Sequence, residues 1–118
     1  MSDHRVVVPL NDPPALVVCP SFWRLLRMLP ADQRAEVQGT LIAIGRGWCD
    51  LKQEYLNIHS YDWTAMLDPP RRMLLAVGLK DEGPFVLVID LFQIRFAAGP
   101  SPQDRLEAAQ KCWRAWRP

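Results

Sequence analysis

The sequence predicts an α+β domain: a small antiparallel-rich sheet with an N-terminal helical hairpin and a C-terminal helix. Two apolar runs, 72–79 and 85–92, are dense in Val, Ile, Leu and Phe, as central strands buried on both faces tend to be. A helical stretch split by a proline precedes them, and an amphipathic segment opened by a Ser-Pro pair follows. The expected order is therefore strand, two helices, three strands and helix.

Two short runs at the start of the chain are candidates for strands. Residues 1–14 hold Val6 to Val8 among prolines, which predicts an edge strand or an irregular lead-in, because prolines cannot donate to a strand ladder. The run "ALVVC", 15–19, predicts a buried strand. From there on, residues 15–118 are expected to form a single domain, since 118 residues provide one core but not two.

A helical hairpin is predicted next. Ser21 is the expected N-cap of a short helix that runs to Leu29. Pro30 interrupts it, because a proline cannot continue the helical hydrogen bonds. A second helix is expected over 31–44, where apolar residues recur at helical spacing, and glycines at 45–47 end it.

The rest of the chain is predicted to be strands followed by one helix. Residues 48–61 show no clear period and are expected to form a loop with local structure at most, whereas "WTAML", 63–67, is a strand candidate. The segment "KDEGP", 80–84, suits the hairpin turn between the two long apolar strands. Ser101 is the expected cap of the last helix, with Asp104 three residues later.

Charge and cysteine content limit the function classes. Fourteen Lys and Arg against thirteen Asp and Glu give a net charge of +1, so any nucleic-acid binding has to depend on a local patch. The longest apolar runs fall far short of the roughly 20 residues that span a bilayer, and we expect neither a secretory signal nor a membrane partner. Three cysteines without a CxxC pair predict reduced thiols in a cytoplasmic protein, with no metal site and no cofactor.

Two segments resemble the RelE/ParE toxin superfamily, most nearly its HigB-like, phage-derived branch. The first, "CPSFWRLLRMLPADQRAEVQGTLIAIGRG" (19–47), is similar to that family's opening strand and helical hairpin. The second, "RRMLLAVGLKDEGPFVLVIDLFQIRFAAGPSPQDRLEAAQKCW" (71–113), resembles its strand starting at Arg, its hairpin, its apolar strand ending in a Phe-x-Lys-Lys type motif and its final helix. The likeness covers residues 15–116 and implies a RelE-like fold.

The resemblance implies a toxin that is neutralised by a cognate antitoxin. Most members of the superfamily are ribosome-dependent mRNA endonucleases (mRNA interferases), while the ParE branch inhibits DNA gyrase. Metal-independent RNA cleavage needs a base for the ribose 2′-hydroxyl, charge stabilisation at the phosphate and an acid for the leaving oxygen. The implied partners are therefore the antitoxin, the ribosome and mRNA.

The resemblance also implies roles for individual residues. Arg72 and Arg95 fall on phosphate-stabilising positions, with surface ion pairs as the structural alternative. His59 and Asp90 are candidate proton carriers, although His59 is also consistent with an exposed loop residue, and Asp90 with a strand-end ion pair or with a position on the solvent face of its strand. The candidate substrate-binding residues are Lys52, Arg71, Phe92 and Gln93.

Two tryptophans on the last helix form a candidate partner-binding surface. Trp113 and Trp116 lie on one side of the predicted helix, where they either face an antitoxin or dock the helix on the sheet.

The departures from the family pattern favour a second hypothesis, a non-catalytic binding module on the same fold. Ile94 occupies the first basic position of the motif, and Leu75 replaces a tyrosine that many members carry. Such a module would block a protein target, as the gyrase-inhibiting branch does, or bind partners as a degenerate toxin. No phosphate loop, metal-ligand spacing or nucleophile motif supports an enzyme of another class.

Overall fold

The computed structural model describes residues 6–8, 15–45, 51–55, 57–80, 83–95 and 99–116. In chain order the elements are β1 (Val6–Val8), β2 (Ala15–Val18), α1 (Pro20–Arg27), α2 (Ala31–Gly45), β3 (Lys52–Tyr55), β4 (Ile58–Trp63), β5 (Arg71–Lys80), β6 (Gly83–Gln93) and α3 (Pro102–Ala115).

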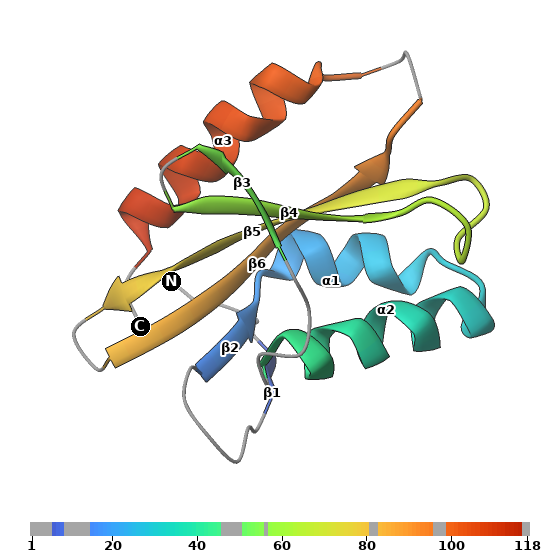
Figure 1. The fold of residues 1–118 in the computed structure, drawn as a ribbon, viewed down its shortest axis with the longest axis horizontal. Coiled ribbons are helices and arrows are strands. Elements are labelled where there is room, and N and C mark those ends of the chain that lie inside the picture. The colour runs from blue at the N-terminus through green and yellow to red at the C-terminus, as the bar shows by residue number, and fades with distance from the viewer. Residues whose placement is uncertain are drawn as a thin grey trace.

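The predicted α+β class is confirmed, with a helical hairpin before the main strands and a helix after them. The sheet has six strands in the order β1-β2-β6-β5-β4-β3. Strands β3 to β6 form an antiparallel meander, β2 joins β6 in parallel, and β1 pairs with β2 at the edge. Helices α1 and α2 cover one face of the sheet and α3 covers the other, here called the hairpin face and the α3 face (Figure 1).

Two strand predictions were wrong. Strands β3 (52–55) and most of β4 (58–63) form within the segment 48–61, where a loop was expected. The expected strand 63–67 overlaps β4 only at Trp63, and residues 64–67 form no strand. The cause is a polar residue at a buried position of β4. Ser60 is only 3% exposed, and its buried hydroxyl is satisfied because it donates to Glu54 Oε2 at 2.6 Å. A polar residue at this position breaks the apolar alternation of the strand.

The start of α1 also differs from the prediction. The helix begins at Pro20 with Cys19 as N-cap, so Ser21 lies inside the helix, and its Oγ reaches the Ile89 carbonyl at 3.5 Å. A proline at the first helical position is favourable because its missing N–H has no partner there anyway. The predicted cap of α3 is confirmed, because Ser101 Oγ accepts the Asp104 N–H at 3.1 Å.

The central strands are buried on both faces and divide the core into two clusters. Met73 and Leu75 of β5 face the hairpin, whereas Leu74 and Ala76 face α3. The hairpin face is filled from α1 and α2 by Phe22, Leu26, Leu29, Val37, Leu41 and Ile44. On the α3 face, Trp113 of α3 packs in the same cluster as Leu74 and Ala76 and is 8% exposed.

A β-bulge in β6 allows apolar residues on both sides of it to face the same core cluster. The register pairs Leu74 with Asp90 but Leu75 with Val88, so Ile89 is the extra residue. Before the bulge Val88 faces the hairpin, and after it Leu91 does. The bulge therefore places Phe92 on the α3 face together with Arg72, its pair partner on β5.

No helix in the described part of the chain is both long enough and apolar enough to cross a bilayer. The longest, α2, has 15 residues.

The close approach of α3 to β5 makes Gly78 sensitive to substitution. A Cβ at Gly78 would lie 2.7 Å from Cζ2 of Trp113 and 2.9 Å from Nδ2 of Asn57. We expect Gly78→Ala to lower the free energy of unfolding by about 1–3 kcal/mol in urea titrations, because the ring must shift in a packed layer. Gly39→Ala is the matched control: a Cβ there meets nothing within 4 Å, so this helical substitution should raise stability by about 0.5–1 kcal/mol. Equal effects of the two variants would contradict the tight packing of Trp113.

Candidate functional site

A cavity of about 120 Å³ opens on the α3 face, between the sheet and the first turns of α3. It is lined by Glu54, Arg72, Leu74, Phe92, Pro102, Gln103 and Leu106. Strands β3, β5 and β6 and helix α3 all contribute, so charged groups from the sheet meet apolar groups from both layers. This set of residues is the candidate site.

Arg72 is the cation of the cavity, and a neighbouring strand orients it. Asp62 lies directly opposite on β4 and holds the guanidinium with two bonds, Nε to Oδ1 at 2.8 Å and Nη2 to Oδ2 at 3.0 Å. The hydrogen bonds that Arg72 donates to Asp62 raise the pKa of Arg72, burial opposes this, and the negative charges of Asp62 and Glu54 add to the rise. The bidentate pair leaves the other edge of the guanidinium to reach an anion.

Glu54 is the carboxylate of the same cavity. Its Oε2 accepts the Ser60 hydroxyl at 2.6 Å and lies 3.8 Å from Lys52 Nζ. The side chain of Glu54 is 18% exposed, whereas that of Lys52 is 74% exposed. The carboxylate is therefore held at the cavity wall, with the exposed ammonium of Lys52 on its solvent side.

Asp90 and Arg105 form the second charged pair on this face. Arg105 Nη1 donates to both carboxylate oxygens of Asp90, at 2.9 and 2.8 Å, and its guanidinium carbon lies 4.5 Å from the centre of the Phe92 ring. The Leu91 N–H also donates to Asp90, at 2.8 Å. Asp90 thus has the ion pair that was considered as its structural alternative, and the partner is Arg105 of α3.

His59 is not brought to this cavity. It pairs with Leu75 and alternates along β4 with Ser60, so its side chain leaves the sheet on the hairpin face. Its Nδ1 lies 2.9 Å from the Asn57 carbonyl. The predicted proton carrier and Arg72 therefore lie on opposite faces of the sheet.

Two predicted substrate-binding residues also face away from the cavity. Arg71 and Gln93 are paired directly opposite each other, one position out of phase with Arg72 and Phe92. Burial lowers the pKa of Arg71. Of the four predicted substrate-binding residues, Phe92 lines the cavity and Lys52 borders it through Glu54.

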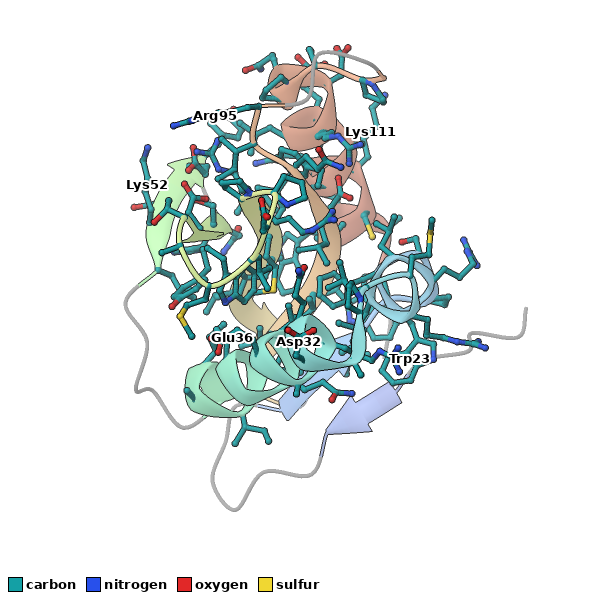
Figure 2. All side chains as sticks on the ribbon, turned by 90° about the vertical axis from the view of Figure 1, so that its right-hand side faces the viewer. Trp23, Asp32, Glu36, Lys52, Arg95 and Lys111 are labelled. Atoms are coloured by element: carbon teal, nitrogen blue, oxygen red, sulfur yellow. The ribbon has the colours of Figure 1, made fainter. Side chains whose placement is uncertain are left out.

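Arg95 lies in the turn that follows β6. The turn is anchored by the Ile94 N–H, which donates to the Pro70 carbonyl at 3.0 Å, and the Arg95 side chain is exposed. Figure 2 shows Arg95 beside the start of α3, with Lys52 on the same side of the molecule. These two cations extend into solvent on one side, separate from the anchored cation Arg72.

The two tryptophans of α3 pack in the apolar layer beneath the helix. Trp113 is buried against β5, and Trp116 is half-buried beside the same cluster. Their arrangement is the docking alternative considered for the last helix. Among the residues that the structure describes, no group of three or more His, Cys, Asp or Glu gathers to hold a metal ion.

The sequence reasoning did not identify Glu54, Asp62 or Arg105. Glu54 lies in the segment expected to be a loop, and Asp62 follows directly after it. The alternation of Ser60 with Asp62 becomes informative only once β4 is known to be a strand. Arg105 sits one turn after the cap of α3, and only the docking of that helix on β6 brings it to Asp90.

The pair formed by Asp90 and Arg105 should contribute measurably to stability. Arg105→Ala should lower the free energy of unfolding by about 1–3 kcal/mol, because Asp90 is left half-buried without its ionic partner. Adding Asp90→Asn should recover part of the loss in a double-mutant cycle followed by urea unfolding. Lys111→Ala, an exposed position of the same helix, is the control and should change stability by no more than about 0.5 kcal/mol. Strictly additive effects of the two substitutions would mean that the contact carries no stability.

Comparison with known proteins gives no independent assignment. No protein-family model matches the chain, and neither a curated protein nor a solved structure shows significant similarity to it. The resemblance to the toxin superfamily therefore stays a prediction from the sequence.

Proposed function

We propose that the protein is a toxin-type inhibitor of translation that cleaves mRNA at the cavity on the α3 face. The observation that carries the proposal is the meeting of Glu54 and Arg72 in one cavity, each anchored by a residue of a neighbouring strand. A carboxylate beside a fixed guanidinium suits cleavage of RNA at a phosphodiester without a metal ion. The order of strand, helical hairpin, strands and final helix supports the resemblance to the RelE/ParE superfamily.

The cleavage step assigns one task to each charged residue. Glu54 accepts the proton of the ribose 2′-hydroxyl, whose oxygen attacks the adjacent phosphorus. Arg72 stabilises the negative charge that develops on the phosphoryl oxygens. The bond to the 5′-oxygen breaks, and that oxygen takes a proton from the Lys52 ammonium. The products are a 2′,3′-cyclic phosphate and a 5′-hydroxyl.

The remaining groups of the site suit the binding of an RNA strand. Phe92, Pro102 and Leu106 provide an apolar wall for a base. Arg95, exposed on the same side as Lys52, provides a backbone contact outside the cavity. In this proposal the protein acts in the cytoplasm on mRNA in the ribosome and is neutralised by a cognate antitoxin.

The direct test is expression of the chain in a bacterium, with transcriptome-wide mapping of new mRNA 5′ ends. Glu54→Gln keeps an acceptor for Ser60 but removes the base, and should reduce cleavage about 100-fold or more. Arg72→Gln should cause a loss of similar size, because the phosphate charge is no longer stabilised. Arg27→Gln on α1 removes the same charge from the opposite side of the sheet and should leave cleavage unchanged.

The same variants separate a chemical role from a structural one. Far-ultraviolet circular dichroism and urea unfolding should show that Glu54→Gln is folded, and ultraviolet crosslinking should show that it still binds RNA. Cleavage that persists in both Glu54→Gln and Arg72→Gln would exclude this site as the nuclease centre.

A second candidate function, a non-catalytic binding module, is favoured by a specific observation. The two predicted proton carriers do not meet at Arg72: His59 lies on the hairpin face, and Asp90 is occupied by Arg105. Such a module should arrest growth without producing new mRNA ends, and the arrest should survive Glu54→Gln. Inhibition of DNA supercoiling by purified gyrase would identify one such target, and RNA ends that require Glu54 would reject the binding module.

A further inference from the structure

Two cysteines that are far apart in the sequence meet in the fold. Cys19 and Cys112 are separated by 93 positions, yet their Sγ atoms lie 3.9 Å apart. Both are present as thiols, without a disulfide between them. The sequence alone predicted separated, reduced thiols, so the contact is a product of how α3 docks.

The backbone on both sides of the contact is held in place. Cys19 caps α1: its N–H donates to the Val88 carbonyl at 2.9 Å, and its carbonyl accepts the Trp23 N–H at 3.0 Å. Cys112 lies in the last turn and a half of α3, next to the buried Trp113. Side-chain rotation, together with small shifts of the two elements, has to bring the sulfurs to the roughly 2.0 Å of a disulfide bond.

Cys112 is the more reactive thiol of the two. Its side chain is half-buried, whereas Cys19 is buried. The hydrogen bond with Cys19 lowers the pKa of Cys112 to about 7, although burial acts in the opposite direction. Cys112 therefore forms a thiolate more readily than an ordinary cysteine, and the thiolate is the form that reacts with peroxides.

We propose that Cys19 and Cys112 are a modification site at which peroxide forms an intramolecular disulfide. The Cys112 thiolate attacks one peroxide oxygen, the O–O bond breaks, and hydroxide leaves, so that Cys112 becomes a sulfenic acid. The Cys19 sulfur then attacks the Cys112 sulfur, the S–O bond breaks, and the leaving hydroxide takes the Cys19 proton to form water. In total two thiols are oxidised to one disulfide, and one hydrogen peroxide is reduced to two waters.

The disulfide would fix the helix that forms one wall of the cavity. It joins the β2–α1 junction to α3, which contributes Pro102, Gln103 and Leu106 to the cavity lining. Oxidation therefore clamps the docked position of α3 and closes a long loop of the chain. This inference rests on the two cysteines and does not depend on the proposed nuclease activity.

The test is to treat the reduced full-length chain with a small excess of hydrogen peroxide, block residual thiols with N-ethylmaleimide and map the peptides by mass spectrometry. The expected product is a monomer with one linked peptide pair, Cys19 to Cys112, that dithiothreitol reverses. Its midpoint of thermal unfolding should rise by roughly 10 °C, because the crosslink constrains the unfolded chain. The same treatment in urea should give a mixture of pairings, since folding no longer selects the partner.

Three variants complete the design. Cys49→Ser should still form the disulfide, whereas Cys112→Ser should abolish it. Cys19→Ser should leave Cys112 as a sulfenic acid that dimedone traps. Links to Cys49, crosslinks between two molecules, or a yield of the Cys19–Cys112 pair that is no higher for the folded chain than in urea would each overturn the proposal.

Discussion

The antiparallel pairing of β5 with β6 determines which side chains meet on each face of this sheet. Arg72 lies opposite Phe92 and Leu74 opposite Asp90, so the register brings Arg72 and Asp90 to the α3 face. Both strands are buried on both faces. A shift of one residue in their pairing would move each side chain of the shifted strand to the opposite face of the sheet. The bulge at Ile89 is part of the same constraint, because it resets the alternation of β6 before the strand reaches the cavity.

Charge at the candidate site is organised as local pairs instead of a basic surface. Arg72 is held by Asp62, and Asp90 is held by Arg105, in each case through two bonds. Such pairing restricts the orientation of a guanidinium before any ligand arrives, which lowers the cost of ordering it on binding. A protein with a net charge of +1 can in this way present a directed cation at one cavity while its whole surface stays close to neutral.

The sequence was sufficient for the central strands and the three helices, because long apolar runs and helical spacing follow directly from burial. It was insufficient for β3 and β4, where the buried polar residue Ser60 breaks the pattern. The candidate site was recovered only in part for the same reason. The face of the sheet on which His59 lies follows only from the alternation of β4. Glu54 and Arg105 can be recognised only when the segments that lie beside them in the fold are known. Strand register and helix docking decide these positions, and a local sequence pattern specifies neither of them.

The parallel pairing of β2 with β6 has a consequence for how the chain folds during its synthesis. Leu16 of β2 lies opposite Val86 of β6, so one edge of β2 has no native partner until most of the chain has left the ribosome. The helical hairpin and the meander are built from local contacts and can begin to form earlier. The hairpin-face core, which draws on β2 and β6 together, is therefore completed late in vectorial synthesis, and the exposed edge of β2 is the segment most open to wrong pairing until then.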